Sequence, residues 1–384
     1  MKTLNKRVLI LGGYGTFGSR IAQLLGSDPA LHLIIAGRDK LKAAETASRL
    51  PTSAESLRLQ RDAINLSAQL EDLHLDLLIH CAGPFQNQDY RVARACIDAR
   101  IPYIDIADAR RFVCDFPRLS NAAQRAGVTL VSGASSLSAL SSAVLQQAQR
   151  ELAEIHTADI VIAPAHRISR GPATVRAGFE SLGRGFPVLQ DDRWHETFAG
   201  GSLRHTRLAH PVGGRYVCDF DVPDLELWPR QLPALSSVRF GTGVQPRALQ
   251  LGLALCARLA RLNLPATTPR LARLAGSLAS RWPGGSPHGG MKVLISGRDG
   301  SGMPCTYQWQ ILGLNADGPW IPAAPAAALA RKFLSGQAPA QGAHTCWQLL
   351  TLEDILAELA PYSVVTATQK KTPAELARKG ANRV

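Results

Sequence analysis

Several signatures that assign a sequence to a common functional class are missing here. The seven cysteines are widely spaced and include no C-x-x-C pair, which argues against a Cys-rich zinc site and against a disulfide framework. Aromatic residues make up only 6% of the chain and form no stacking platform with arginine, so no nucleic-acid partner is expected. The H-E-x-x-H, P-loop and G-x-S-x-G motifs are also absent.

Long apolar runs are absent as well. No stretch of about 18 residues, the length that a membrane-spanning helix needs, is both apolar and free of charge. The best candidate, 249–260, is interrupted by Arg258. Residues 1–7 lead directly into the apolar run 8–11 and lack the apolar region of a signal peptide. Together with the cysteine pattern, this predicts a cytoplasmic protein with reduced thiols.

What the chain does contain is an ordinary globular composition. It has 384 residues, of which 46% are hydrophobic and 19% charged. That length allows two or three domains of roughly 150 residues each. The 43 basic and 30 acidic side chains give a net charge of +13, and the basic residues are scattered rather than blocked. An enzyme that handles anionic ligands accounts for this charge.

The first 140 residues alternate short apolar runs with helical patterns. Strands are predicted at 8–11, 33–36, 57–60, 77–80, 103–106 and 129–132. Helices are predicted between them, at 19–25, 41–49, 65–73, 90–99 and 116–126. This alternation is typical of βαβ units, whose right-handed crossovers build a doubly wound parallel sheet. The predicted fold class is therefore α/β, with a Rossmann domain.

The pattern changes from about residue 155, where the predicted strands are accompanied by turn residues typical of β-hairpins. Strands are predicted at 158–163, 291–296 and 306–312, and helices within 244–282 and at 350–360. The last two strands flank a glycine-rich turn, which is typical of a hairpin. These features predict a second domain with mixed or antiparallel strands. Residues 369–384 are polar and basic, and we expect a flexible tail there.

The strongest local signal is a glycine-rich turn that follows the first strand and opens the first helix. It reads Gly12-Gly13-Tyr14-Gly15-Thr16-Phe17-Gly18. Gly13 permits the tight turn, Gly15 lets the backbone approach a pyrophosphate, and Gly18 lets helix and strand pack closely. Free N–H groups at the start of the helix then face the phosphates. This context predicts a dinucleotide site, and the alternative is a glycine-rich turn without a ligand.

The end of the second strand refines the cofactor. An NAD site usually places Asp or Glu there, to bind the ribose 2′-hydroxyl. Here small residues are followed by Arg38, which could pair with a 2′-phosphate, and Lys40 and Lys42 add positive charge. This favours NADP(H). In the alternative, Asp39 binds the ribose and Arg38 is solvated.

Two further segments follow strands at positions where the cofactor is expected. Asp62, after the third strand, is placed to meet the adenine edge, or is a loop or cap residue. The fourth strand is followed by Ala82-Gly83-Pro84-Phe85. Ligands of open α/β sheets bind beyond the strand ends at the switch point, so this loop is predicted to lie near the nicotinamide. A Gly-Pro turn without a ligand is the alternative.

These residues resemble the saccharopine dehydrogenase-like family of NADP-dependent oxidoreductases. Over 1–140 the resemblance rests on the glycine-rich turn, Gly37-Arg38, Ala82-Gly83-Pro84-Phe85, Tyr103-Ile104-Asp105, Ala107-Asp108 and Gly133-Ala134-Ser135-Ser136. Two later segments are similar to a bacterial branch described as saccharopine dehydrogenase NADP-binding domain proteins. They are Arg170-Gly171-Pro172-Ala173-Thr174-Val175 and Ile321-Pro322-Ala323-Ala324-Pro325.

The resemblance implies both an architecture and a reaction. It implies an NADP-binding Rossmann domain at 1–140, completed by a C-terminal helix at 345–368. It also implies an inserted α+β substrate and dimerisation domain at 141–344, and hence a homodimer. The implied reaction is hydride transfer to or from a carbon–nitrogen or other polarised double bond of a small molecule. Members that handle amino acids carry an Asp-Pro-Gly type turn where this chain has 134–137, so the substrate class stays open.

The candidate catalytic residues follow the parallel strands, where a reductase needs a substrate pocket and a proton donor. They are Asp108, Tyr103 and Ser135. The candidate substrate ligands in the same region are Gln86, Arg110 and Ser136. The alternatives are structural: Asp108 as a helix N-cap, Tyr103 as a core residue, and the two serines as caps of the next helix.

The second domain offers further polar groups. His166 and Arg170 follow a strand and could clamp an anionic substrate group, and a solvated loop is the alternative. Acidic side chains crowd together at Asp219, Asp221 and Asp224. Because this segment lacks the full Ca²⁺-loop pattern, no metal is expected.

Polar residues also recur at helical spacing within 244–282. They are Arg247, Gln250, Arg258, Arg261, Arg270, Arg273 and Ser277. Such a stripe could rest on a membrane, but a helix pair packed on the domain or on a dimer mate is favoured. Three functions therefore stay open. We favour an NADPH-dependent reductase over a non-catalytic NADP-binding sensor or scaffold and over a peripheral membrane reductase with a lipophilic substrate.

Overall fold

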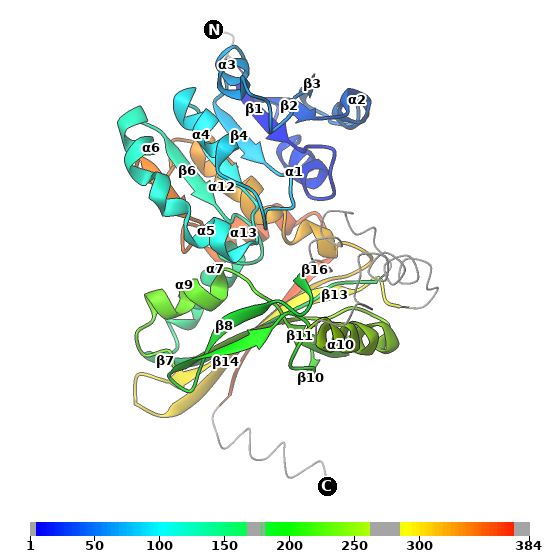
Figure 1. The fold of residues 1–384 in the computed structure, drawn as a ribbon, viewed down its shortest axis with the longest axis vertical. Helices are drawn as coiled ribbons and strands as arrows, with labels where there is room; N and C mark the ends of the chain where they lie inside the picture. Colours follow the sequence, from blue (N-terminus) through cyan, green and yellow to red (C-terminus); the bar gives the residue numbers. More distant parts are fainter. Residues whose placement is uncertain (1–4, 167–177, 179–180, 262–284, 372–384) are drawn as a thin grey trace. The chain divides into compact units, whose positions relative to one another are not determined.

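The computed structural model describes residues 5–166, 178, 181–261 and 285–371 (Figure 1). The chain divides into two compact units. Unit 1 comprises Met1–Ala143 and Pro319–Pro361, and unit 2 comprises Val144–Gly318 and Tyr362–Val384. Each unit is therefore built from two separate stretches of the chain.

Unit 1 contains a seven-stranded parallel sheet in the order β15-β6-β5-β4-β1-β2-β3. Its strands are β1 (Lys6–Leu11), β2 (Leu31–Gly37), β3 (Ser53–Arg58), β4 (Leu77–His80), β5 (Tyr103–Asp105), β6 (Thr129–Ser132) and β15 (Gly342–Thr345). The chain starts at β1, builds outward to β3 and then returns to β4 on the other side of β1. The switch point therefore lies between β1 and β4, and the predicted doubly wound α/β fold is confirmed.

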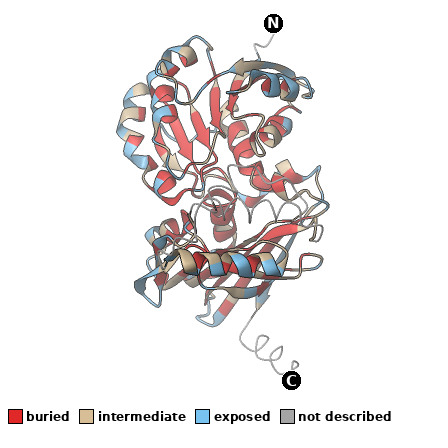
Figure 2. Cartoon of the chain, turned by 45° about the vertical axis from the view of Figure 1, so that its right-hand side comes forward, coloured by how far each residue is buried: buried red, intermediate tan, exposed pale blue. Residues whose placement is uncertain are grey.

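The central strands are apolar because helices cover both faces of the sheet. Every residue of β4, and 8–11 of β1, is buried, as the red strands of Figure 2 show. Strands of this kind read as continuous apolar runs. The helices of this unit up to β6 are α1 (Gly18–Leu25), α2 (Lys40–Ala47), α3 (Leu66–Glu71), α4 (Arg91–Asp98), α5 (Arg110–Cys114), η1 (Phe116–Leu119) and α6 (Ser120–Ala126), and α7 (Ala139–Ala148) follows β6.

Residues 319–361 return to unit 1 after the long excursion through unit 2. Helix η2 (Gly318–Trp320) leads into α12 (Ala324–Leu334), which is followed by β15 and by α13 (Leu352–Leu359). The buried alanines of α12 allow close packing against α1, α13 and β4. Arg331 donates a hydrogen bond to the Leu24 carbonyl (2.8 Å) and pairs with Glu358 (2.6 Å). One guanidinium therefore joins α12 to the end of α1 and to α13.

Unit 2 contains a mixed seven-stranded sheet in the order β10-β11-β12-β7-β13-β14-β16, and a separate hairpin of β8 and β9. The elements are β7 (Glu154–Ala163), β8 (Gly185–Gln190), β9 (Arg193–Phe198), β10 (Arg204–Arg207), β11 (Gly214–Asp219), α9 (Asp224–Gln231), β12 (Ser237–Thr242), α10 (Arg247–Arg261), β13 (Gly289–Arg298), β14 (Pro304–Gly313) and β16 (Val364–Lys371). Only β12 and β7 pair in parallel. The mixed and antiparallel strands that the sequence predicts for this part of the chain are thus present in the structure.

Several elements differ from the sequence-based expectation. The segment 345–368, expected as a helix, holds the end of β15, then α13 and most of β16. The β-branched residues of 364–366 explain the last strand, because they favour extended backbone. The stretch 319–344 belongs to unit 1 rather than to the inserted domain, and 369–371 continue β16. The third strand begins at Ser53, four residues earlier than predicted.

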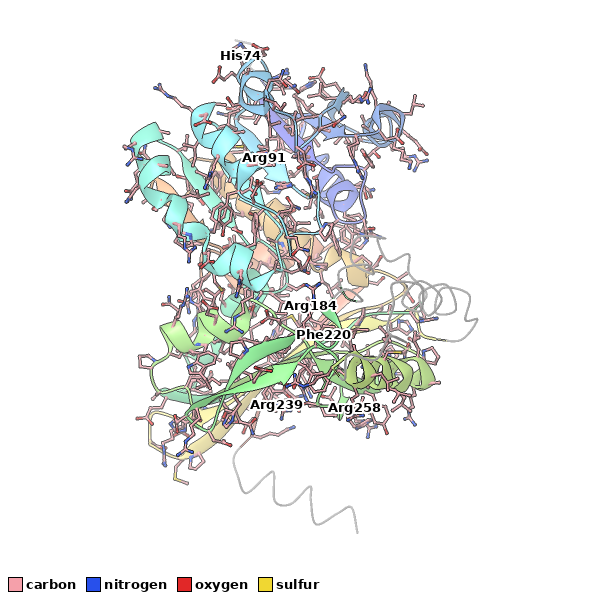
Figure 3. The ribbon with its side chains drawn as sticks, viewed as in Figure 1. His74, Arg91, Arg184, Phe220, Arg239 and Arg258 are labelled. Atoms are coloured by element: carbon pink, nitrogen blue, oxygen red, sulfur yellow. The ribbon has the colours of Figure 1, made fainter. Side chains whose placement is uncertain are left out.

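The helical stripe predicted within 244–282 is also different. Only α10 falls within the described residues, and 262–284 lie outside them. Gln250 is buried, where its amide accepts from the Val244 N–H (2.8 Å) and approaches Cys218 Sγ (3.1 Å). The outward face of α10 instead carries Leu251, Leu255 and Arg258, the last of which is labelled in Figure 3. No helix among the described residues is long and apolar enough to span a bilayer.

Candidate functional site

The glycine-rich turn connects β1 to α1 and is held by backbone contacts that exclude side chains. Gly12 has φ +82°, and a Cβ on it would lie 2.8 Å from the Ala82 nitrogen. A Cβ on Gly18 would collide with the Gly12 carbonyl oxygen. The turn, the start of α1 and the loop after β4 therefore approach one another as closely as backbones can. This is the packing that the motif predicts.

Amide groups at the start of α1 are available to a ligand. Phe17 precedes the helix and provides no side-chain cap, and no acidic residue lies in the first turn. Within the described part of the chain, the N–H groups of Thr16, Phe17 and Gly18 have no hydrogen-bond acceptor. Unpaired N–H groups at a helix N-terminus bind anions, and phosphate in particular. The geometry here fits the pyrophosphate of a dinucleotide.

Tyr14 has a positioning role that the sequence pattern does not reveal. Its ring lies against Gly37, where any Cβ would collide with it. Its hydroxyl accepts a hydrogen bond from the Asp39 N–H (3.1 Å). The side chain therefore fixes the turn after β2 relative to the glycine-rich turn. Only a glycine at position 37 leaves room for this ring.

A basic hollow of about 650 Å³ lies beyond the carboxyl end of β2. It is lined by Tyr14, Arg38, Asp39, Lys40, Leu41, Lys42 and Arg58. Four basic side chains therefore line the hollow together with a single carboxylate, that of Asp39. This carboxylate already accepts hydrogen bonds from the chain itself. Asp39 Oδ1 accepts from the N–H groups of Leu41 (3.1 Å) and Lys42 (3.2 Å), which makes Asp39 the N-cap of α2. The hollow is thus electrostatically suited to an anion.

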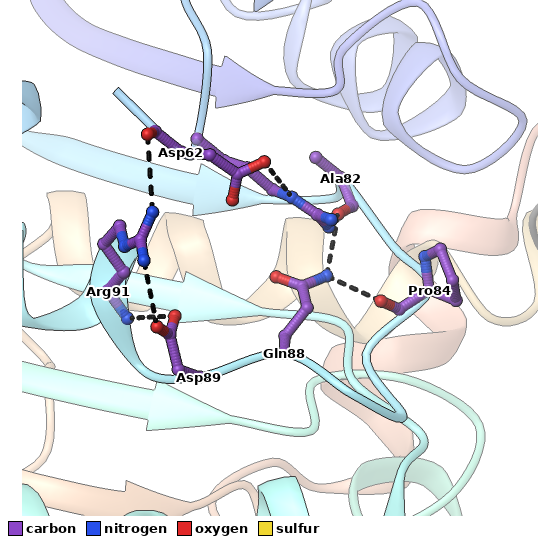
Figure 4. A network of polar contacts seen from close by, with 7 residues as sticks. Asp62, Ala82, Pro84, Gln88, Asp89 and Arg91 are labelled. Carbon is purple, nitrogen blue, oxygen red and sulfur yellow. Dashed lines mark hydrogen bonds and ion pairs between the residues drawn. The ribbon is translucent and has the colours of Figure 1, made fainter. Parts of the chain in front are cut away.

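Two side chains hold the loop after β4 in place (Figure 4). Arg61 Nη1 donates to the Ala82 carbonyl (2.8 Å), and Gln88 Nε2 donates to the carbonyls of Ala82 (2.9 Å) and Pro84 (2.8 Å). Asp62 is exposed, and its carboxylate meets Arg61 Nε at 3.4 Å. Neither Arg61 nor Gln88 is marked by a sequence motif, because no local pattern shows which backbone carbonyl a polar side chain will bond.

Arg91 adds a second tie to the same region. Its guanidinium donates to the Asp62 carbonyl (3.3 Å) and meets Asp89 (3.4 Å) (Figure 4). Arg91 opens α4, so this contact joins the loop after β3 to the helix after β4. Both loops lie beyond the carboxyl ends of strands of the same parallel sheet, although β1 and β2 lie between β3 and β4. The loops predicted to lie at the adenine and nicotinamide ends of the cofactor are therefore both held by side-chain hydrogen bonds.

A buried polar cluster lies beneath the ends of β4, β5 and β6. Asp105 is completely buried and accepts four hydrogen bonds of 2.9–3.0 Å. The donors are the N–H groups of Ala107 and Gly133 and the hydroxyls of Ser132 and Tyr103. His80 Nδ1 lies 3.1 Å from the Tyr103 hydroxyl, and His80 Nε2 has no hydrogen-bond partner among the residues that the structure describes. The cluster therefore ties together three strand ends at the switch-point edge.

Burial sets the protonation states in this cluster. It raises the pKa of Asp105 to about 6, although the four hydrogen bonds favour the ionised form. It lowers the pKa of His80 to about 3, and Arg61 acts in the same direction. It also raises the pKa of Tyr103 well above its usual value. At neutral pH the Asp105 carboxylate accepts from Tyr103, so the neutral His80 ring must donate to Tyr103 through Nδ1–H.

The remaining predicted site residues of unit 1 have distinct surroundings. Asp108 is exposed, and Gln86 Nε2 donates to its carboxylate (3.3 Å). Although the residue as a whole is exposed, its carboxyl is desolvated enough to raise its pKa. The Ser135 hydroxyl donates to the Pro322 carbonyl (3.1 Å), while Ser136 and Arg110 are buried. Tyr103 is a core residue whose hydroxyl is already engaged.

The candidates of the second domain lie in unit 2 or outside the described residues. His166 donates its backbone N–H to the Ser286 carbonyl (2.9 Å), whereas Arg170 lies outside the described residues. Asp219 is paired with Arg204 (2.8 Å) rather than grouped with other acidic residues. Among the residues that the structure describes, no cluster of three His, Cys, Asp or Glu side chains could hold a metal.

Comparison with solved structures reports on the fold. Saccharopine dehydrogenase (L-Glu forming) from Saccharomyces cerevisiae superposes with a TM-score of 0.68 at 12% identity, over 96% of this chain and 100% of that one. A mutant meso-dapdh with DAP from Clostridium tetani E88 gives 0.44 at 14% identity, over 97% and 99%. A probable dehydrogenase from Thermotoga maritima gives 0.43 at 11%, over 92% and 93%. Only the first likeness is close enough to support the fold.

Comparison of sequences identifies the N-terminal part of the chain. No curated protein matches the chain significantly. Residues 8–162 match the family described as Saccharopine dehydrogenase NADP binding domain. This stretch contains the glycine-rich turn, the basic hollow and the Asp105 cluster, and it agrees with the resemblance drawn from the sequence motifs. Over residues 8–162, the chain is therefore similar to the saccharopine dehydrogenase NADP-binding domain family.

Proposed function

We propose that this protein is an NADP(H)-dependent oxidoreductase that transfers a hydride to an imine or to another polarised double bond of a small molecule. The basic hollow beyond β2 carries the proposal. A 2′-phosphate is the chemical difference between NADP and NAD, and the residues after the second strand of such a fold meet that position. Four cations at this place favour the phosphorylated cofactor.

The state of Asp39 supports NADP(H) over NAD(H) as the cofactor. An NAD site needs a free carboxylate that accepts from the ribose hydroxyl. The Asp39 carboxylate instead accepts from two amides of α2, and Lys42 Nζ lies 3.6 Å from its second oxygen. Among the described residues, no carboxylate forms an ion pair with the other three cations of the hollow, Arg38, Lys40 and Arg58. Leu41, with 83% of its surface exposed, offers an apolar face beside them for the adenine.

The other parts of the cofactor fit the neighbouring groups. The amides of Thr16, Phe17 and Gly18 would hold the pyrophosphate, and the braced loop of Ala82, Gly83, Pro84 and Phe85 would lie at the nicotinamide end. When bound, NADPH supplies the hydride. Both arrangements follow from the switch-point position of these loops.

Asp108 is the residue we propose to provide the proton. The Tyr103 and Ser135 hydroxyls are hydrogen-bonded inside unit 1, whereas Asp108 is an exposed residue whose carboxyl is desolvated enough to have a raised pKa. A raised pKa keeps a larger share of the acid protonated near neutral pH, as a general acid requires. Gln86 donates to this carboxylate and would orient it. Arg110 and Ser136, together with His166 and Arg170, remain proposed substrate ligands, in a cytoplasmic enzyme with reduced thiols.

Cofactor titration tests the proposal. We expect NADPH to bind at least about tenfold more tightly than NADH, because charge-assisted hydrogen bonds contribute roughly 1.5–3 kcal/mol. The Arg38→Ala variant should lose most of this preference while its NADH affinity stays unchanged. The measurement is fluorescence or calorimetric titration with both nucleotides, followed by NADPH oxidation with carbonyl–amine pairs.

Arg49→Ala is the matched control. Arg49 follows α2, is exposed and does not line the hollow. Its removal should change neither affinity. Equal binding of the two nucleotides would contradict the assigned 2′-phosphate site. Tight NADPH binding without turnover of any acceptor would favour a sensor over an enzyme.

A further inference from the structure

The hairpin of β8 and β9 lies beside a part of the mixed sheet of unit 2 where one strand edge is unpaired. β12 pairs with β7 along its whole length, whereas β11 pairs with it only at Gly241 and Thr242. Residues 237–240 of β12 therefore have one edge that no described strand pairs with. β8 contacts β12 without joining its hydrogen-bond ladder. Space for side chains is thus left between the hairpin and β12.

The hairpin is fixed to the sheet at both of its ends. At its turn, the Asp191 N–H donates to the Ser237 hydroxyl (2.9 Å). Just beyond β9, the Gly200 N–H donates to the Asp219 carbonyl (2.9 Å). A hollow of about 170 Å³ lies between the hairpin and β12. Its walls therefore come from elements that are hydrogen-bonded to one another.

One part of the lining of this hollow is apolar. It consists of Phe186 and Val188 from β8, Leu225 from α9 and Phe240 from β12. Val188 is half-buried and the other three are buried. A cavity of about 150 Å³ is large enough for benzene, whereas drug-sized ligands need roughly 300–1,000 Å³. The hollow therefore suits a molecule with an apolar body about the size of a six-membered ring.

The charged part of the lining includes one cation without a partner. Two carboxylates line the hollow, and each is paired with an arginine outside the lining. Asp219 pairs with Arg204 (2.8 Å), and Glu196 pairs with Arg261 (3.1 Å). The half-buried Arg239, labelled in Figure 3, forms no hydrogen bond or ion pair with any described residue. Its guanidinium can donate two parallel hydrogen bonds to a carboxylate.

The ions next to the hollow leave the same imbalance. Arg204 pairs with Asp159 (2.6 Å) as well as with Asp219. Burial lowers the pKa of the nearby Lys292, and Asp159 counteracts this by favouring its charged form. The group therefore contains three cations and two carboxylates. A bound monoanion would balance these charges, which a partly buried group of ions requires.

We propose that this hollow binds a small molecule with one carboxylate and an apolar body of about the size of a six-membered ring, and that the carboxylate pairs with Arg239. The site lies entirely within unit 2 and does not rest on the proposed cofactor or reaction. Gln190, His195 and Thr197 also line the hollow and would meet further polar groups of such a ligand.

Titration with benzoate tests the proposal, with the uncharged benzamide as the matched ligand. We expect benzoate to bind at least about tenfold more tightly in calorimetry or ligand-observed NMR, because hydrogen bonds between charged groups are stronger. Arg239→Gln should weaken benzoate binding by a similar factor. Arg258→Gln, which removes the same charge from the outward face of α10, should not. Absence of benzoate binding to wild type, or equal affinity in Arg239→Gln, would overturn the proposal.

Filling the hollow tests the site without removing a charge. Val188→Phe places a ring in the space proposed for the ligand and should abolish benzoate binding while the circular dichroism spectrum is retained. Arg38→Ala, which removes a cation from the basic hollow of unit 1, should leave benzoate affinity unchanged. Retained binding in Val188→Phe, or lost binding in Arg38→Ala, would contradict the assigned position.

Discussion

At the scale of single residues, Asp105 is the group on which most of the predicted site depends. Its two oxygens accept from the loops after β5 and β6 and from the Tyr103 hydroxyl, which also contacts His80 at the end of β4. The sequence marks Asp105 only as part of a motif. Its hydrogen-bond donors lie on β5, on β6 and in the loops that follow them, and the long-range contacts with Ser132 and Gly133 cannot be read from local patterns. His80 was missed for the same reason, since a histidine that ends an apolar run carries no signal of its own.

The effect of an Asp105 substitution on the free energy of unfolding should depend strongly on the residue that replaces it. Asp105→Ala leaves four buried donors without an acceptor and should lower the free energy of unfolding by about 3 kcal/mol or more. In Asp105→Asn the side-chain oxygen can keep three donors. The amide can then donate to Tyr103, which donates to His80 Nδ1 while the ring proton moves to the unpartnered Nε2. This variant should stay within about 1 kcal/mol of wild type at pH 7 in chemical denaturation.

The pKa of Asp105 also predicts how the free energy of unfolding changes with pH in wild type and in Asp105→Asn. The pKa of Asp105 rises from 3.8 to about 6 on folding, so the native state binds more protons between these values. The contribution of Asp105 to stability is thus fully present below about pH 4 and falls by about 3 kcal/mol as the pH rises through 6. Asp105→Asn should lack this decline. If the free energy of unfolding changed equally with pH in wild type and in Asp105→Asn, Asp105 would not titrate as described.

At the scale of elements, sequence patterns predict best where a strand is buried on both faces. β1 and β4 were predicted within two residues because parallel strands covered by helices read as apolar runs. β16 was missed because it is polar and lies at an edge, and β15 because its sequence, Gly342-Ala343-His344-Thr345, forms no apolar run. The glycine-rich turn was predictable for a local reason, since backbone atoms meet there with no room for side chains.

Gly18 provides the sharpest test of that turn. In Gly18→Ala the new methyl group must displace the Gly12 carbonyl, which moves the amides of the turn. We expect stability to fall by about 1–3 kcal/mol, as for other overpacked sites, and NADPH affinity to fall more than tenfold. Ser19→Ala, one residue later in the same helix, is the control and should retain both properties. Full NADPH affinity in Gly18→Ala would contradict the phosphate assignment.

At the scale of the whole molecule, unit 1 is completed only by residues 319–361. β15 covers the edge of β6, and Arg331 bonds the end of α1. The boundary near residue 140 could be inferred from the change of pattern, but the early return at 319 could not. Nothing local distinguishes a helix that packs on unit 1 from one that packs on unit 2.

Fragments should reveal this dependence. Residues 1–143 alone should show no cooperative thermal transition, because the β6 edge and the α12-facing side of the unit are uncovered. A fusion of 1–143 to 319–361 through a flexible linker should unfold cooperatively in circular dichroism and bind NADPH. A cooperative transition of 1–143 equal to that of the fusion would show that the second segment is dispensable.

The divided construction of unit 1 has a consequence for synthesis on the ribosome. The glycine-rich turn is translated early in unit 1, yet the strand and helices that complete its sheet are translated after nearly the whole of unit 2. During most of translation the nascent chain therefore carries an exposed β6 edge. Cofactor can stabilise this unit only near the end of synthesis, so a truncated product should be recognised by the cell as unfolded.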